Sequence, residues 1–402
     1  MQLMATHRPL PPTWVMGLGF LPLGASGSLT LITVPQLMAA DHVPEQRIAG
    51  ITAIVLTPLF LSFILTPLLD WRLDRRTYAI IFSLLGALAQ FLALLFIHDL
   101  TLVTVMLLIS GFSIALVVSA VGGWFGNLTG TEQKSSLGAW FTVANLGAGG
   151  LVATIAIYVL RDMPYALGAG LLSLTIILAL PLYLYVECPP ADRRLASESF
   201  RAFVRDVLAL LRKPSVLWTL LLFLMPCASF ALTNLLGGLG RDFHTSEQLV
   251  GLIGGVGVTV AGVIGSLLVP PMAKRVEPRA LYLLVGIVGA AFTTLLVVLA
   301  RTPVTYGLSS LGENVFQAAA FSVSNVIILR TIGYDNPLAA TQFGLLNAAA
   351  GLPLAYMQAI DGHFYGFCGV SGSYLADAVV SGGACLAIGA LFWALRRTIP
   401  KI

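Results

Sequence analysis

Long apolar runs fill most of the chain, and short polar gaps separate them. Most runs hold about 20 residues or more, which is the length a helix needs to cross a hydrocarbon core of about 30 Å. The pattern predicts twelve membrane-spanning helices, at residues 14–40, 48–69, 78–97, 102–125, 138–160, 165–186, 214–240, 248–270, 280–300, 304–329, 338–360 and 373–395. We therefore expect an all-α membrane protein.

The basic residues alternate from gap to gap. All 22 Lys and Arg residues lie in the gaps or the tails, and every second gap is basic. The intervening gaps hold only Arg47, Arg161, Arg241 and Arg301. Because Lys and Arg beside a span are retained on the cytoplasmic side, this bias predicts a multi-pass protein of the plasma (inner) membrane with both termini in the cytoplasm.

Composition supports the same class of protein. The chain is 57% hydrophobic and 10% charged, whereas soluble domains carry about 25% charged residues. The net charge of +4 is explained by basic loops that face lipid headgroups. We therefore expect membrane lipids as partners and no nucleic acid.

The longest polar stretch divides the spans six and six. It predicts a first six-helix bundle in residues 1–186, a cytoplasmic linker with an amphipathic helix in 187–213, and a second bundle in 214–402. A weak repeat at an offset of about 203 residues supports the division, because it aligns Pro67, Arg72 and Arg76 with Pro270, Arg275 and Arg279. Two six-helix halves in parallel repeat resemble the major facilitator fold, in which substrate binds between the halves.

Two carboxyl groups lie well inside predicted spans, Glu313 and Asp377. Ionisable groups at membrane depth are costly, so each is a candidate functional residue. Glu313 shares a helical face with neutral polar side chains, and a buried carboxyl group without a nearby cation favours its protonated form. We predict that Glu313 couples transport to protons, with a permanently protonated, structural Glu as the alternative. Asp377 lies nearer a span end, and we interpret it as structural.

The other polar groups at membrane depth are amides and hydroxyls. With no Lys or Arg among them, they favour a neutral or amphipathic polar solute over a small multivalent anion. The predicted substrate cavity consists of Ser26, Thr30, Thr33, Asn145, Asn234, Asn314, Gln317, Asn325, Thr341, Gln342, Asn347 and Gln358.

Catalytic and cofactor motifs are missing from the sequence. All five His residues lie in predicted tails or loops, and no Walker, zinc-hydrolase or Gly-x-Ser-x-Gly motif is present. We expect a protein that is not an enzyme, has no metal site and no cofactor, and is driven by a gradient of ions or substrate.

The loop after the second predicted span resembles the cytoplasmic gating loop of major facilitators. In that family an Asp at the helix end meets neighbouring helix termini, and Arg residues pair across the gate. The resemblance implies a gate built from Asp70, Arg72, Asp74, Arg75 and Arg76. The alternative is a charge run that only sets topology.

Several segments resemble the peptide, acetyl-coenzyme A and drug transporter family, which includes the AmpG-like muropeptide permeases. They are the segment Leu65–Arg76, the pair Glu313 and Asn314, the segment Ala340–Leu346, and Gly351 to Pro353. The resemblance implies proton-coupled import (symport) of a muropeptide-like or siderophore-like solute.

Together these patterns predict a secondary active transporter that works by alternating access. Its expected partners are a small-molecule substrate and protons, and we expect it to act as a monomer. Two alternatives are an exporter of small organic compounds and a membrane receptor or sensor that has lost transport.

Overall fold

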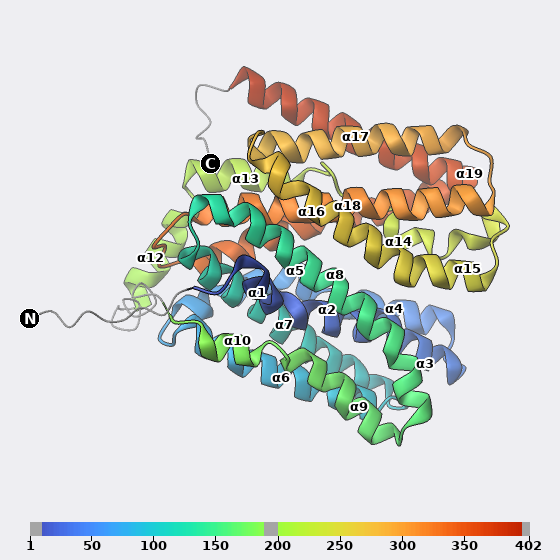
Figure 1. Ribbon diagram of the computed structural model, residues 1–402, viewed down its shortest axis with the longest axis horizontal. Coiled ribbons are helices and arrows are strands. Elements are labelled where there is room, and N and C mark those ends of the chain that lie inside the picture. Colours follow the sequence, from blue (N-terminus) through green and yellow to red (C-terminus); the bar gives the residue numbers. More distant parts are fainter. Residues whose placement is uncertain (1–9, 189–199, 396–402) are drawn as a thin grey trace, which may run out of the picture.

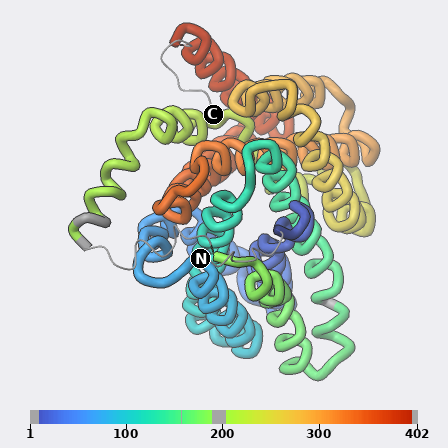
Figure 2. Tube along the Cα trace, turned by 60° about the vertical axis from the view of Figure 1, so that its left-hand side comes forward, coloured from blue at the N-terminus to red at the C-terminus, as the bar shows by residue number. Residues whose placement is uncertain are grey.

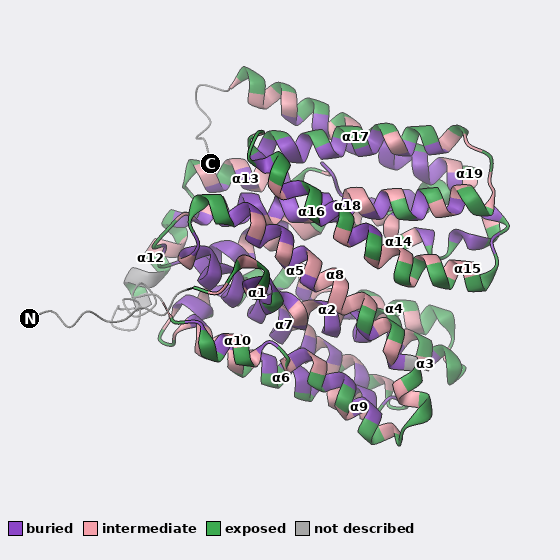
Figure 3. Cartoon of the chain, in the orientation of Figure 1, coloured by how far each residue is buried: buried purple, intermediate pink, exposed green. Residues whose placement is uncertain are grey.

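The computed structural model describes residues 10–188 and 200–395, and in them the chain forms helices joined by short turns. Ten helices in this part of the chain are long and apolar enough to cross a membrane, or eleven if the bent pair at 204–224 counts as one span. The prediction of an all-α membrane protein is confirmed. Many large apolar side chains are exposed, as expected for a surface that faces lipid. Figure 3 shows buried and exposed positions alternating along the helices.

The first half of the chain, before residue 187, holds six spans. The first span, Thr13–Ala40, is made of α1 (Thr13–Gly17), α2 (Leu21–Ser28) and α3 (Val34–Ala40) joined by 3-10 and π-helical turns. The next spans are α4 (Glu45–Val55) with α5 (Pro58–Leu61), α6 (Arg75–Leu95), α7 (Leu100–Leu128), α8 (Thr131–Asp162), and α9 (Tyr165–Leu174) with α10 (Leu180–Tyr185). A 3-10 turn, η4 (Thr66–Asp70), closes the second span.

The second half begins after the linker. Its helices are α13 (Pro214–Leu224), α14 (Thr233–Leu236), α15 (Glu247–Leu252), α16 (Val258–Ala273), α17 (Pro278–Val298), α18 (Pro303–Ile332) and α19 (Ala339–Ala394). Helix α12 (Phe200–Leu210) lies in the linker itself.

The seventh span is broken, so the predicted continuous helix at 214–240 is wrong. Pro226 has no amide hydrogen and disfavours a helical conformation at the residue before it, and Met225 is extended. Ala228 and Phe230 then adopt left-handed backbone angles, with φ of 55° and 49°. Helix resumes only at α14.

The last two spans are longer than predicted. Helix α19 runs over 56 residues and leaves helical geometry only at Cys368 and Gly369. We call residues 339–367 its first arm and 370–394 its second arm. The predicted gap at 361–372 is therefore mostly helix, and Asp361 lies inside the first arm.

Helices of each half pack against helices of the other half. Helix α8 packs against α16 and α18, whereas the first arm of α19 packs against α5, α7 and η4 (Figures 1 and 2). This arrangement is typical of two related halves that face each other across a central axis. The described chain begins and ends at one end of the molecule, on the left in Figure 1, which we call the terminal end; the opposite end is the distal end.

Helices α2 and α8 approach closely at a glycine. A Cβ atom built on Gly24 would lie 1.9 Å from the backbone oxygen of Asn145. Small residues permit such backbone contact between membrane helices.

We expect Gly24→Ala to destabilise the protein by roughly 1–3 kcal/mol, because the added methyl group forces the two helices apart. The measurement is the thermal unfolding midpoint of purified protein in detergent. Gly27→Ala is the matched control, since a Cβ there meets no atom within 4 Å. Equal midpoints for the two variants would contradict the close contact.

Candidate functional site

Asp70 joins the two halves at the terminal end. Its side chain is buried at the end of η4. Its carboxylate accepts hydrogen bonds from the amide of Thr341 at 2.7 Å, the hydroxyl of Thr341 at 2.7 Å, and the amide of Ala340 at 3.3 Å. A carboxylate of the first half therefore caps the first turn of α19 in the second half.

Arg75 completes this contact. It pairs with Asp70 at 2.7 Å, and both side chains are at most 1% exposed. Arg75 also donates to the carbonyl oxygens of Pro337 at 2.8 Å and Asn336 at 3.2 Å. The side-chain amide of Asn127, on α7, donates to the same Asn336 oxygen at 2.9 Å. These bonds close the terminal end between the two halves.

A second basic residue ties the halves together nearby. Lys134, near the start of α8, donates from Nζ to the carbonyl oxygens of Leu329 at 2.8 Å and Gly333 at 2.5 Å. These carbonyl oxygens lie at the C-terminal end of α18, where a cation interacts favourably with the helix dipole. Lys134 is one of the basic residues in the gaps between predicted spans, which indicate topology alone, and neither Asn127 nor Asn336 was a predicted site residue.

The other predicted gate residues stay within the first half. Arg72 is exposed and lies 4.5 Å from the ring centroid of Trp71. Asp74 caps α6 by accepting from the amide of Thr77 at 2.8 Å. Arg76 is half-buried. In the described part of the chain, Arg72, Asp74 and Arg76 make no hydrogen bond to the second half.

Two predicted cavity residues lie at this closed end. Thr341 binds Asp70, and Gln342 donates to the carbonyl of Thr331 at 2.9 Å and accepts from Asn336 at 2.8 Å. Both side chains are buried. In this conformation Thr341 joins the two halves, and Gln342 stabilises the turn between α18 and α19.

The predicted cavity residues of the first span form a buried network. Ser26 and Thr30 donate to the Gln90 side-chain oxygen at 3.4 and 3.3 Å, and Ser110 donates to it at 3.2 Å. Thr33 is buried, and its hydroxyl has no partner among the described residues.

Three amides of α18 are also bonded within the protein. Asn314 donates to the carbonyl of Ser310 at 2.8 Å, and Gln317 donates to the hydroxyl of Thr233 at 2.5 Å beside the broken span. Asn325 reaches across the halves to Thr142 at 3.3 Å.

Four amides of the predicted set are more accessible. Asn145 and Asn347 are half-buried and make no side-chain hydrogen bond within the described residues, and Asn234 donates to Gln358 at 3.3 Å. Asn347 lies on the face of α19 that turns toward the first half, because Gly344 and Gly351 on that face pack against Thr66 and Leu59. These amides are the best placed of the predicted set to meet a solute.

Glu313 is completely buried. It lies about 15 Å along α18 from the distal end, at 1.5 Å per residue. Its Oε1 accepts from the hydroxyl of Thr293, on α17, at 2.6 Å, and its Oε2 has no partner.

Two further carboxyl groups belong to the same centre. Asp361, on the first arm of α19, is 0% exposed, and Asp377, on the second arm, is 2% exposed. Neither oxygen of Asp361, nor Oδ1 of Asp377, has a hydrogen-bond partner among the described residues. Both are electrostatic neighbours of Glu313, so a charge on one of these carboxyl groups disfavours a charge on the others. We call these three residues the carboxyl centre.

One member of the carboxyl centre corrects the sequence prediction. Asp361 was expected in a gap between spans, yet it lies inside the first arm of α19 and is buried. Asp377 is buried as well, and its interpretation as a structural residue stays a prediction. In the described chain no Lys, Arg or His forms an ion pair with any of the three. No group of three or more His, Cys, Asp or Glu side chains there could hold a metal ion.

A polar pair lies between the carboxyl centre and the distal end. Ser309, one turn before Glu313, is hydrogen bonded to the hydroxyl of Tyr374, one turn before Asp377. Arg301 stacks on the Tyr374 ring at 5.2 Å and donates to Ser371 at 2.8 Å. Polar groups thus extend from the distal end toward Glu313.

Comparison of the sequence with known families identifies the protein class. The profile of the Major Facilitator Superfamily matches residues 16–238, which is more than half of the chain. The chain belongs to the Major Facilitator Superfamily. This superfamily consists of transporters and not of enzymes, so the predictions of a secondary transporter and of no enzymatic activity are confirmed. No curated protein matches the sequence.

Solved structures of the Major Facilitator Superfamily share the fold. The proton:xylose symporter XylE, bound to 6-bromo-6-deoxy-D-glucose, is 14% identical with a TM-score of 0.73 over 97% of this chain and 95% of that chain. The E. coli fucose:proton symporter FucP is 16% identical with a TM-score of 0.69 over 95% and 97%. A bacterial homologue of the iron transporter ferroportin, in an outward-facing state, is 16% identical with a TM-score of 0.66 over 96% and 100%. None of these matches points to the muropeptide permeases.

Proposed function

We propose that the protein is a proton-coupled symporter of a neutral or amphipathic polar solute. In this proposal Glu313 binds the coupling proton, and Asp361 and Asp377 belong to the same proton-binding centre. The solute binds between the halves near Asn145, Asn234, Asn347 and Gln358.

The observation that carries the proposal is the burial of three interacting carboxyl groups without a cation. An isolated buried carboxylate is strongly disfavoured, and like charges in one site cannot all be ionised. Protonation removes the charge at each group. A centre that must take up protons when it is closed, and can release them when it opens to water, supplies the switch that coupled transport requires.

In this proposal the solute reaches its site by alternating access. Closure of the terminal end by Asp70, Arg75 and Lys134 supports a state open toward the distal end. The proposed orientation places the terminal end in the cytoplasm, because the described basic loops gather there. Bundles at residues 1–186 and 214–402, joined by the linker, would rock as two bodies in the plasma membrane.

The substrate class follows from the polar groups that face the solute. Amides without a neighbouring cation suit hydroxyl-rich and amide-rich solutes. The segments that resemble the AmpG-like family favour a muropeptide-like or siderophore-like solute, while XylE and FucP, which are named as proton symporters of sugars, add pentoses and hexoses to the compounds worth testing.

The test is a thermal-shift screen of purified protein with muropeptides, siderophores and sugars, since a ligand of the folded state raises its stability. A solute that binds is then followed in proteoliposomes with an acidic exterior. We expect accumulation that stops when a protonophore is added. If uptake of the solute is the same with and without the pH gradient, and with and without the protonophore, proton coupling is ruled out.

A further inference from the structure

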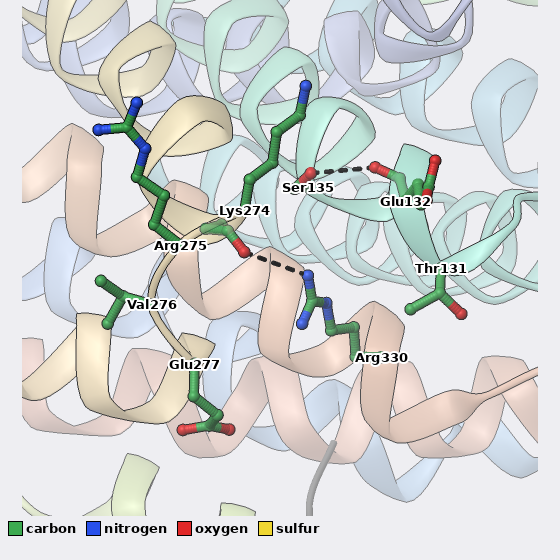
Figure 4. A pocket seen from close by; sticks show the side chains of 9 residues that line it. Thr131, Glu132, Ser135, Lys274, Arg275, Val276, Glu277 and Arg330 are labelled. Atoms are coloured by element: carbon green, nitrogen blue, oxygen red, sulfur yellow. Dashed lines mark hydrogen bonds between the residues drawn. The ribbon is translucent and has the colours of Figure 1, made fainter.

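A cavity of about 630 Å³ opens between the two halves at the terminal end, apart from the carboxyl centre (Figure 4). Its walls come from both halves: the first turn of α8, the end of α16 with the turn to α17, and α18. The lining residues are Thr131, Glu132, Ser135, Ala273, Lys274, Arg275, Val276, Glu277 and Arg330.

The basic residues of this cavity have spare hydrogen-bonding capacity. Lys274 and Arg275 form no ion pair or hydrogen bond through their side chains within the described chain. Arg330 donates only to the carbonyl of Ala273, at 3.4 Å, and its buried Nε has no partner. Of the two acidic residues, Glu277 is engaged at the start of α17, where it accepts from the amide of Ala280 at 3.1 Å, and Glu132 is exposed. Three basic and two acidic residues line the cavity, so its lining carries a net charge of +1, and Lys274 and Arg275 have no ion-pair partner among the described residues.

The internal repeat shows what this cavity lacks. At the offset of 203 residues Glu277 corresponds to Asp74, and both cap the helix that follows. At the same offset Ala273 corresponds to Asp70, the carboxylate that caps the facing helix of the other half. The cavity thus has an Ala where the first copy of the contact has its negative charge.

Helix α8, which faces Ala273, has no carboxylate among the described residues that caps its first turn. Helix α8 starts after Gly130, which has no side chain to cap it. In the residues described, no acceptor binds the amides of Thr131 or Glu132. Asp70 and Arg75 close the contact between η4 and α19. At the corresponding contact between α16 and α8 there is an open cavity lined by basic residues.

We propose that this cavity binds a phosphate group, which supplies the negative charge missing at Ala273 and ties the start of α8 to α16 and α18. Guanidinium groups and free helix amides are the groups that recognise phosphate. The phosphate comes either from an anionic phospholipid headgroup or from free inorganic phosphate. The ligand would stabilise the state that is closed at the terminal end.

The experiment measures the thermal unfolding midpoint of the full chain under two sets of conditions. In detergent, inorganic phosphate is titrated against chloride at equal ionic strength. In vesicles, phosphatidylcholine is compared with phosphatidylcholine that contains phosphatidylglycerol. If inorganic phosphate raises the unfolding midpoint, the ligand is the free ion. If only phosphatidylglycerol raises it, the ligand is the lipid headgroup. Either result supports the site if the variants below behave as expected.

Two variants test the location. Lys274→Gln with Arg275→Gln should weaken the response on the order of tenfold, as expected when two charge-assisted contacts are lost. Ala273→Asp should remove the response by placing a carboxylate where the phosphate binds. The control is Arg212→Gln with Lys213→Gln, an exposed basic pair outside the cavity, which should respond like the wild type.

Three results would overturn the proposal. The first is no stabilisation in either condition. The second is a control variant at Arg212 and Lys213 that loses as much of the stabilisation as the variant at Lys274 and Arg275. The third is a wild-type response in Ala273→Asp. Because the substitutions at 274 and 275 are at exposed positions, they leave the test intact even if Ala273→Asp fails to fold.

Discussion

Proton-driven accumulation of the solute is expected to disappear in Glu313→Gln. Glutamine keeps the shape of the side chain and can still contact Thr293, but it cannot bind and release a proton. A gradient of one pH unit is worth about 1.4 kcal/mol per proton, or a tenfold accumulation of a neutral solute. In proteoliposomes with that gradient, the ratio of inside to outside solute should fall from about ten to about one.

Exchange of labelled for unlabelled solute separates coupling from folding. Exchange needs no net proton movement, so Glu313→Gln should still catalyse it. Glu247→Gln, a matched change at an exposed position near the distal end, should retain accumulation. Full accumulation in Glu313→Gln would refute the assignment, and retained accumulation in Asp361→Asn would remove Asp361 from the proton-binding centre.

The spans were predictable from sequence because membrane helices must be long and apolar wherever they lie. The predicted starts and ends at 165–186, 248–270 and 304–329 fall within a few residues of the observed spans Tyr165–Tyr185, Glu247–Ala273 and Pro303–Ile332. Glu313 could be singled out because it is the one charged residue within its predicted span, 304–329. Asp70 could be recognised because it ends a span beside a basic loop.

The position of Asp361 inside a helix could not be predicted, because the polar residues around it are typical of a loop between spans. Asp361, Gly362 and His363 lower the local hydropathy, so the pattern predicts that the span ends at residue 360. The helix nevertheless continues past Asp361, which is completely buried and whose carbonyl oxygen accepts from the hydroxyl of Ser373 on the second arm of α19 at 2.8 Å. Packing of this kind cannot be read from the local sequence. The break near Pro226 was missed for the opposite reason, since the sequence stays apolar through it.

The terminal gate is expected to open in Asp70→Asn. The substitution removes the counter-charge of Arg75, which is 1% exposed, and leaving one member of a buried ion pair alone costs about 3–5 kcal/mol. It also weakens the cap on α19. The Asp70–Arg75 pair lies within the first half, but its burial and the cap on α19 both depend on the closed terminal end. Losing the cap and leaving Arg75 buried without its counter-charge therefore favours the state in which that end is open and Arg75 meets water.

Distances between spin labels on the two halves measure this change. Labels at Arg72 and Tyr334, both exposed at the terminal end, are introduced in a background with Cys188 and Cys368 replaced by serine. Asp70→Asn should add a longer-distance population. Asp74→Asn is the matched control, because Asp74 caps α6 within its own half, so it should cost only about 1 kcal/mol of stability and leave the distances unchanged.

A second substitution tests whether the buried charge is the cause. Replacing Arg75 by glutamine in Asp70→Asn removes the uncompensated cation, so the double variant should be less destabilised than the sum of the single variants. Its short-distance population should partly return, because the closed state no longer buries a lone charge. Additive effects, or unchanged label distances in Asp70→Asn, would mean that Asp70 and Arg75 stabilise the first half without controlling the gate.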